Sequence, residues 1–63
     1  MLEDFYDEMK GAYIFSLNDL NYALNSSVYL FLRDNPDWSL GYFGEDYDTE
    51  DDLYILYDKN KEY

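Results

Sequence analysis

The 63-residue sequence contains no cysteine and no histidine, and it has only one proline, three glycines and four lysines and arginines together. Without cysteine and histidine, the chain can form neither a disulfide framework nor a metal site with thiolate or imidazole ligands. Nucleophilic catalysis that depends on a thiol or an imidazole is excluded for the same reason. The stability of the fold must therefore come from packing or from a partner.

The short chain leaves little room for an active site. A domain of this length buries only about 60% of the surface that its unfolded chain exposes, which makes a deep cleft hard to build. Gly41 and Gly44 are too few and too near acids to cradle a phosphate. Paired carboxylates arise by chance in any acidic chain, so they do not by themselves indicate a glycosidase-like site. We expect one domain over residues 1–63 that is not an enzyme and holds no cofactor.

Targeting features are also missing from the sequence pattern. The residues from Met1 to Glu8 place acids where a signal peptide needs a basic region followed by an apolar run. The apolar stretch from Val28 to Leu32 is stopped by Arg33, far short of the length of a membrane span. The sequence therefore predicts a soluble cytoplasmic protein without a membrane partner.

Aromatic residues and acids are abundant instead. Hydrophobic residues make up 48% of the chain and aromatic residues 22%, unlike the composition of a disordered acidic tail. Fifteen acids against four bases give a formal net charge of -11. A globule of this length is roughly 27 Å across, and eleven phosphates of duplex DNA occupy roughly 19 Å of its axis. The net charge per unit length of the protein therefore approaches that of duplex DNA. Solubility needs a charge of only about 2 to 8, so the excess indicates a functional field that disfavours nucleic acids as direct partners.

The apolar pattern predicts one main helix. Ser16 is a good N-cap, and apolar residues recur after it at steps of three and four, which predicts a helix over about 17–33. The residue before a proline avoids helical angles, so Asn35 and Pro36 close the helix. The weak helix formers at 25–27 favour, as the alternative, a division into two shorter helices.

Strand-forming segments surround this helix. Residues of about 12–15, 38–43 and 53–58 are expected to form a small antiparallel sheet on which the helix packs, which gives an α+β fold. For 12–15, the alternative is an apolar lead-in to the helix. The apolar spacing of 2–10 suits a short N-terminal helix, which Gly11 would end. An all-helical arrangement is the alternative for the whole chain.

The densest group of acids lies between the second and third expected strands. Carboxylates at this density could bind calcium, so we tested the EF-hand pattern from Asp46. The pattern fails, because Asp51 stands where glycine is required and Tyr57 stands where a bidentate glutamate is required. We predict no specific metal site and interpret the segment as a partner-binding loop. Its candidate residues are Glu45, Asp46, Tyr47, Asp48, Glu50, Asp51 and Asp52.

Further acids extend this negative surface if the fold brings them to the same side. They lie in the N-terminal segment and beside the end of the main helix. The candidate residues outside the loop are Glu3, Asp4, Asp7, Glu8, Asp34 and Asp37. The alternative interpretation of the loop is a solvated connection whose charge only opposes aggregation.

Nine tyrosines are the second unusual feature of the chain. Their rings supply core area in a small domain while their hydroxyls reach the surface, as we expect for Tyr13. Tyr54 and Tyr57 fall on opposite faces of a regular strand, so only one of them faces the helix. Other aromatic residues can anchor an interface, because an arginine stacks on a ring while it pairs with a nearby carboxylate. The candidate anchors are Tyr47, Tyr42 and Trp38.

In its acid clusters, Glu3 to Glu8 and Glu45 to Asp52, the chain resembles the small acidic proteins with which phages inhibit host defence, including anti-CRISPR and anti-restriction DNA mimics. The resemblance is one of kind and covers the whole chain diffusely, without a motif that transfers a residue role. It implies an inhibitor in the cytoplasm of a bacterial host, whose carboxylates stand where phosphates would lie. The implied partner is a basic nucleic-acid-binding complex such as a CRISPR effector, whose access to target DNA is blocked.

Two other functions remain open at this point. An acidic interaction module, such as an antitoxin or an adaptor, would cover a basic partner without mimicking DNA, and a cation-binding protein ranks third. We expect a monomer, with pairing through an exposed strand edge or an aromatic face as the alternative.

Overall fold

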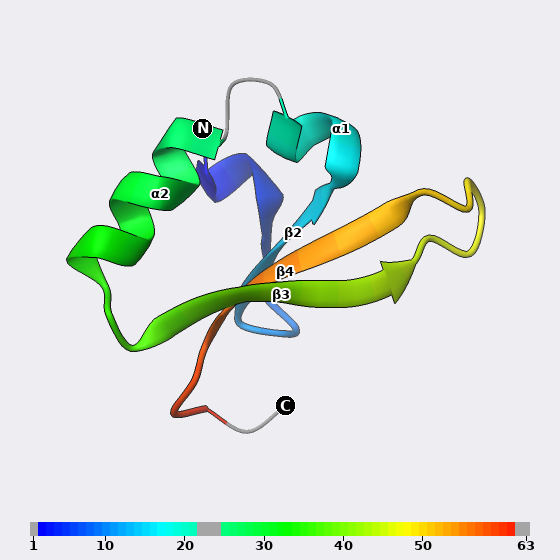
Figure 1. Ribbon diagram of the computed structural model, residues 1–63. Coiled ribbons are helices and arrows are strands. Elements are labelled where there is room, and N and C mark those ends of the chain that lie inside the picture. Colours follow the sequence, from blue (N-terminus) through cyan, green and yellow to red (C-terminus); the bar gives the residue numbers. More distant parts are fainter. Residues whose placement is uncertain (1, 22–24, 62–63) are drawn as a thin grey trace.

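The computed structural model describes residues 2–21 and 25–61, which form a four-stranded antiparallel sheet with a helix on one face (Figure 1). The strand order is β1-β2-β4-β3, and each neighbouring pair is antiparallel. The α+β fold predicted from the sequence is confirmed. The elements are η1 (Leu2–Phe5), β1 (Tyr6–Asp7), β2 (Ala12–Ser16), α1 (Leu17–Asp19), α2 (Asn25–Asp34), β3 (Trp38–Glu45) and β4 (Asp52–Asp58).

The hairpin of β3 and β4 is the longest part of the sheet. Both strands are rich in aromatic and large aliphatic residues, which fit a pleated, half-buried surface. Tyr42 lies opposite Tyr54, but the next pair is Gly44 with Leu53, so Phe43 is the extra residue of a β-bulge. Gly44 has a φ of 134°, a conformation that only glycine adopts readily. The bulge therefore bends β3 just before its acidic end.

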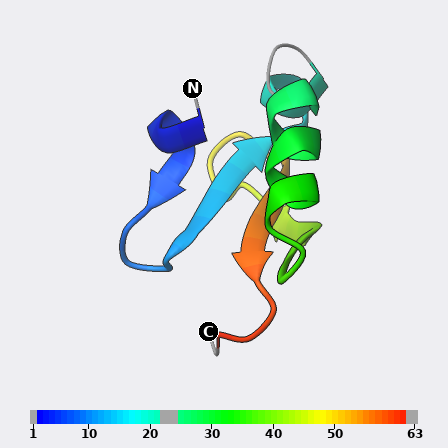
Figure 2. The ribbon, with the colours of Figure 1, turned by 90° about the vertical axis from the view of Figure 1, so that its left-hand side faces the viewer.

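The core lies between the sheet and α2. Phe15 of β2 and Leu56 of β4 are fully buried, and Val28 of α2 packs against both. The ring of Phe5 in η1 lies 5.2 Å from the ring of Phe15 and covers the core from the side of β1. Figure 2 shows η1 and β1 on one side of β2 and α2 on the other. The strand expected over 12–15 is thus confirmed as β2, a central strand of the sheet.

An aromatic cluster extends this core toward the start of β3. The ring of Tyr13 lies 5.6 Å from that of Phe31 and 5.9 Å from that of Trp38, and the latter two rings are 5.1 Å apart. Edge-to-face contacts of this kind stabilise the packing beyond the area they bury. The interpretation of Tyr13 as a core tyrosine is confirmed. Tyr54 shares the face of Leu56, so it is the tyrosine of β4 on the helix side.

The helix expected over 17–33 is divided into α1 and α2. Ser16 caps α1 as predicted, because its Oγ accepts a hydrogen bond from the Asp19 N–H at 3.1 Å and donates one to the Asp19 carboxylate at 2.9 Å. The second helix begins at Asn25, the first of the three weak helix formers. Residues 22–24 lie outside the described residues. The single helix over 17–33 is thus wrong, and two helices are found as in the alternative, but the break expected at 25–27 is also wrong, because these residues form the first turn of α2.

The helix expected over 2–10 is wrong beyond Phe5. The next two residues pair with β2 as strand β1, and the chain then turns back through hydrogen bonds from the Lys10 and Gly11 N–H groups to the Asp7 carbonyl. Gly11 has a φ of 65°, which suits a glycine in a tight turn. Met9 is 97% exposed, so it does not share the buried side on which Leu2 and Phe5 pack against the core.

Candidate functional site

The residues from Glu45 to Asp52 form the acidic hairpin tip, which projects beyond the rest of the sheet (Figure 1). Glu45 and Asp52 lie opposite each other as the last pair of the β3–β4 ladder. Beyond them, the Asp46 N–H bonds to the Asp51 carbonyl at 2.8 Å, and the Glu50 N–H bonds to the Asp46 carbonyl at 2.9 Å. The tip is therefore a closed turn with a defined backbone.

The turn is built by its own polar side chains. Oδ1 of Asp46 accepts hydrogen bonds from the N–H groups of Asp48 at 2.8 Å and Thr49 at 3.4 Å. The Thr49 hydroxyl accepts a bond from the Asp51 N–H at 3.3 Å. Asp46 is half-buried, whereas Asp48, Glu50 and Asp51 are exposed. One acid thus fixes the turn, and its neighbours face solvent.

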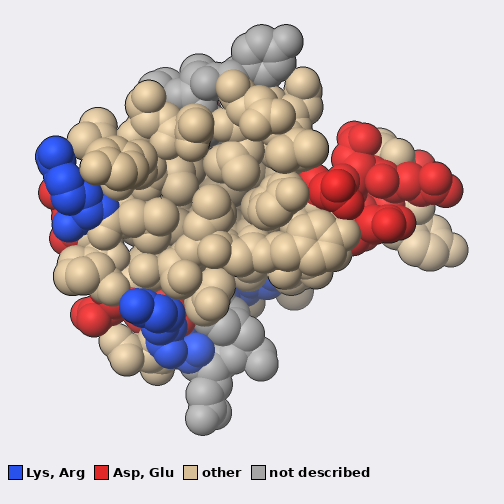
Figure 3. Space-filling model, in the orientation of Figure 1, with Lys and Arg blue, Asp and Glu red and all other residues tan. Residues whose placement is uncertain are grey.

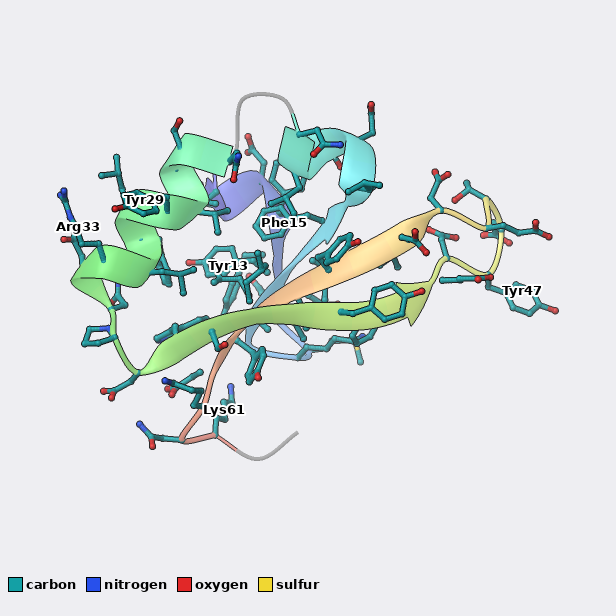
Figure 4. The ribbon with its side chains drawn as sticks, viewed as in Figure 1. Tyr13, Phe15, Tyr29, Arg33, Tyr47 and Lys61 are labelled. Atoms are coloured by element: carbon teal, nitrogen blue, oxygen red, sulfur yellow. The ribbon has the colours of Figure 1, made fainter. Side chains whose placement is uncertain are left out.

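Tyr42 connects the tip to the sheet. Its hydroxyl donates a hydrogen bond to Oδ1 of Asp52 at 3.0 Å, and its ring lies 5.7 Å from that of Tyr54. The bond to Asp52 raises the pKa of the Tyr42 phenol, with smaller contributions from desolvation and from the charges of Asp52 and Glu45. At the end of the tip, Tyr47 is 99% exposed and points away from the molecule (Figure 4). Two of the predicted anchors therefore lie at the tip, while Trp38 belongs to the aromatic cluster.

Three of the four bases lie away from the tip, whereas Nζ of Lys10 lies 5.7 Å from the ring centre of Phe43 beside it. Lys59 and Lys61 follow the end of β4 that is remote from the tip, and the Lys59 N–H bonds to the Asp37 carbonyl at 2.8 Å. Arg33 lies in the last turn of α2, and its Nε is 3.7 Å from Oδ1 of Asp34. Figure 3 shows blue side chains and red ones mixed at the left and bottom, while the red group at the tip on the right has no blue side chain among it.

The antiparallel register explains why the other predicted acids do not join the tip. Ser16 lies opposite Leu53, so β2 runs toward the tip, and β1 and the start of β3 are remote from it. Four of these acids lie at the end of β1 or shortly before β3, and therefore at the end of the sheet that is remote from the tip. They are Asp7, Glu8, Asp34 and Asp37. The two acids of η1, Glu3 and Asp4, lie beyond the opposite edge of the sheet.

Asp7 in particular is occupied by its own turn. Its carboxylate accepts hydrogen bonds from the N–H groups of Met9 at 3.0 Å and Lys10 at 3.3 Å, and Nζ of Lys10 lies 3.4 Å away. Desolvation acts to raise the pKa of this carboxyl, but the bonds from Lys10 and Met9 outweigh it and lower the pKa. Asp7 thus stabilises the turn between β1 and β2, and Lys10 offsets its charge.

Sequence reasoning missed Phe43 and the apolar face of α2. Phe43, the bulge residue, is 45% exposed, and Nζ of Lys10 lies 5.7 Å from its ring centre. On α2, Tyr29 and Leu30 are 68% and 45% exposed. One feature of the sequence indicates the bulge, which is the glycine directly after Phe43. The exposed pair on α2 has no such signal, because it lies within the regular apolar spacing of the helix.

A shallow hollow lies between α1 and the tip and is lined by Leu17, Asn18, Asn21, Glu50, Asp51 and Asp52. Another lies on α2 and is lined by Asn25, Ser26, Tyr29 and Leu30. Within residues 2–21 and 25–61, no group of three acidic side chains is arranged to hold a metal ion.

In the described part of the chain, no helix has the length and apolar character needed to cross a membrane. Comparison of the chain with protein-family models, with curated proteins and with solved structures found no match.

Proposed function

We propose that this protein is a nucleic-acid-mimicking inhibitor, which binds the basic DNA-binding surface of a host defence complex, such as a CRISPR effector, and blocks target DNA. The observation that carries the proposal is the segregation of charge along the molecule. The acidic hairpin tip holds six carboxylates and no base in eight residues, while Arg33 and Lys61 lie away from it (Figure 4) and Lys59 follows the end of β4 that is remote from it. A protein that used acids only for solubility would not need to gather them on one projecting turn.

The size of the tip suits a short DNA motif. Six phosphates occupy roughly 10 Å of duplex axis, or about three base pairs. Such a length matches the short motif that a CRISPR effector reads directly in a duplex. A basic groove that accepts this duplex already presents lysine and arginine side chains to anions, so the tip gains electrostatic steering and fast association. Tyr47 at the end of the tip offers a ring on which an arginine can stack.

Affinity capture from a nuclease-treated bacterial lysate tests the proposal. The protein is immobilised, and bound proteins are eluted with duplex DNA at physiological salt. Under the proposal, DNA releases a nucleic-acid-binding complex, because the tip and the DNA occupy one surface. A captured complex that stays bound at saturating DNA contradicts mimicry.

A pair of variants with equal charge locates the site. The tip variant carries Asp46→Asn, Asp48→Asn, Asp51→Asn and Asp52→Asn, which keep the oxygen atoms that accept the hydrogen bonds of the turn. We expect it to bind the captured complex at least about a hundredfold more weakly, since each charge-assisted contact contributes roughly 1.5–3 kcal/mol. Surface plasmon resonance measures the affinity, and urea unfolding checks that the fold is retained.

The matched control removes the same number of charges elsewhere. It carries the substitutions Glu3→Gln, Glu8→Gln, Asp34→Asn and Asp37→Asn. This end variant should bind within about threefold of the unmodified protein, because only the weak long-range part of the field changes. Equal weakening of both variants would show that net charge alone controls binding and would remove the tip from the proposal.

The exposed aromatic residues favour a second candidate, an acidic interaction module without DNA mimicry. Tyr42 is 59% exposed and Phe43 is 45% exposed, and both lie beside the tip on β3. Aromatic residues of this kind are enriched in protein–protein interfaces. The competition experiment separates the two functions, because a module that contacts a protein outside its DNA site binds together with DNA.

A further inference from the structure

Strand β3 is the last strand of the sheet, so in the part of the chain that the structure describes no strand pairs with its outer edge. The strand has eight residues and leads directly into the acidic hairpin tip. It contains no lysine and no proline, the residues with which proteins commonly block pairing at such an edge. The strand at the opposite edge, β1, has only two residues and therefore presents fewer main-chain groups to an added strand.

Two hydrogen bonds at the ends of the hairpin show which groups of β3 point outward. The bonds from the Lys59 N–H to the Asp37 carbonyl and from the Asp46 N–H to the Asp51 carbonyl each join a pair of residues one step beyond an end of the ladder. Hydrogen-bonded and non-bonded pairs alternate along an antiparallel ladder. Counting inward from either end assigns Gly41 to a bonded pair.

The same alternation leaves Leu40 and Tyr42 in non-bonded pairs with β4. Their N–H and C=O groups therefore face the outer edge, about 6.8 Å apart along the strand. The Trp38 N–H, which has the same parity, is already bonded to the Asn35 carbonyl at 3.0 Å. The middle of β3 thus presents two donors and two acceptors in the pattern that an added strand requires.

The side chains beside this edge differ between the two faces of the sheet. Tyr42 lies on the face of Asp52, whose carboxylate its hydroxyl binds, and Glu45 lies opposite Asp52 on that face. The other face carries Gly41, where an added Cβ would touch the ring of Tyr57, and the exposed bulge at Phe43, whose ring centre lies 5.7 Å from Nζ of Lys10. One face beside the edge is therefore acidic and aromatic, and the other is aromatic with a single base.

We propose that an extended segment of the partner adds to the outer edge of β3 as a fifth strand, with lysine or arginine alternating with apolar residues. The basic side chains lie on the face of Tyr42, Glu45 and Asp52, and the apolar ones lie over Gly41 and Phe43. Main-chain bonds to Leu40 and Tyr42 fix the register, while charge complementarity with the tip selects the segment. The inference rests on the proposed function, since it specifies how a basic partner is held.

Charge also decides between this occupant and a second copy of the chain. Pairing two copies along β3 would bring together two molecules that each carry a net charge of -11. A basic segment instead gains from the tip that continues the same strand. Sedimentation of the protein alone gives the direct test, because a dimer that Tyr42→Pro abolishes would assign the edge to a second copy and overturn the proposal.

A matched pair of substitutions isolates the main-chain contact. Tyr42→Pro removes the outward N–H, and proline is tolerated at an edge position of this orientation. Tyr42→Ala removes the same ring and hydroxyl but keeps the N–H. Slow hydrogen exchange at the Gly41 amide, which bonds to β4, reports whether the ladder survives in each variant.

The probe is a fluorescent ten-residue peptide in which lysine alternates with valine, measured by anisotropy at 0.05 and 0.15 M salt. We expect Tyr42→Pro to bind it about tenfold more weakly than Tyr42→Ala, since the lost N–H leaves a peptide carbonyl without its partner. The same peptide with the main-chain amide nitrogens of its lysines methylated keeps its charge but cannot pair with the edge as an antiparallel strand, because the residues that bond to Leu40 and Tyr42 carry their side chains on the face of Tyr42. It should bind the unmodified protein about tenfold more weakly than the parent peptide.

The outcomes separate this inference from the proposed function. If the methylated peptide binds as tightly as the parent, or if both Tyr42 variants bind equally with the ladder intact, strand addition is wrong and only charge attracts the segment. The tip variant tests the other part. If the tip variant binds the peptide and the captured complex as the unmodified protein does, the proposed function fails together with the inference.

Discussion

Single residues of the acidic hairpin tip divide into two kinds that the sequence does not distinguish. Asp46 and Asp52 both accept hydrogen bonds within the protein, from backbone N–H groups and from the Tyr42 hydroxyl. Asp48 and Glu50 are exposed at the turn. The composition of the run predicted a charged loop, but the division depends on where each side chain points. Variants that test binding should therefore keep the acceptor oxygens of Asp46 and Asp52, and they should vary the charge of Asp48 and Glu50.

The bond between Tyr42 and Asp52 gives a titration that can be measured. Because the raised pKa means that the folded state holds the phenolic proton more tightly than the unfolded state, the stabilisation is fully present below the usual phenol pKa of about 10. It is lost as the pH rises through the raised pKa of the folded state. We expect Asp52→Asn to lower the pKa of Tyr42 toward its usual value, since the charged acceptor is removed.

NMR of ¹³C-labelled tyrosine rings measures this pKa directly. Asp51→Asn is the matched control, because it removes the neighbouring charge and leaves the Tyr42 hydrogen bond intact. An unchanged pKa in Asp52→Asn, or an equal shift in both variants, contradicts the assigned bond.

At the scale of elements, local signals predicted the ends of segments better than their extent. Ser16 marked the start of α1, and Asn35 marks the end of α2, where its N–H and its side-chain amide both bond to the Phe31 carbonyl at 2.8 Å. The strand β1 was missed because its two residues sit inside a spacing of three and four that fits a helix equally well. Only pairing with Ala12 and Tyr13 makes it a strand, and that contact is not local.

The turn between β1 and β2 depends on Gly11. Its φ of 65° is costly for a residue with a Cβ, so we expect Gly11→Ala to lower the free energy of unfolding by about 1–2 kcal/mol. Gly11→Asn should cost less, because asparagine tolerates this conformation. Urea unfolding of both variants measures the difference.

The comparison also separates backbone strain from crowding. A Cβ at this position would meet the end of the Lys61 side chain, and alanine and asparagine share that contact. Equal losses in the two variants would assign the cost to Lys61 and not to the backbone. A further Lys61→Ala substitution would then restore the stability.

At the scale of the whole molecule, size was predictable and the placement of charge was not. The radius of gyration is 11.3 Å, against roughly 11 Å expected for a chain of this length. Whether the acids of 3–8, 34–37 and 45–52 share a surface depends on strand order and register, which only long-range packing fixes. The sheet places the last group alone at one end. The negative surface is therefore smaller than the sequence allows, and it lies on the hairpin with the open strand edge.

The net charge of the molecule makes a prediction about salt. Carboxylates that repel one another in the compact state destabilise it, and salt screens them, with a Debye length that falls from about 14 Å at 0.05 M to about 4 Å at 0.5 M. We expect the free energy of unfolding in urea to rise by about 1 kcal/mol over this range, while affinity for a basic partner falls. The tip variant, with a net charge of -7, should show a clearly smaller rise, since its four removed charges lie closest together. If salt raised the free energy of unfolding equally in the tip variant and the end variant, charge repulsion would destabilise the tip no more than the rest of the surface.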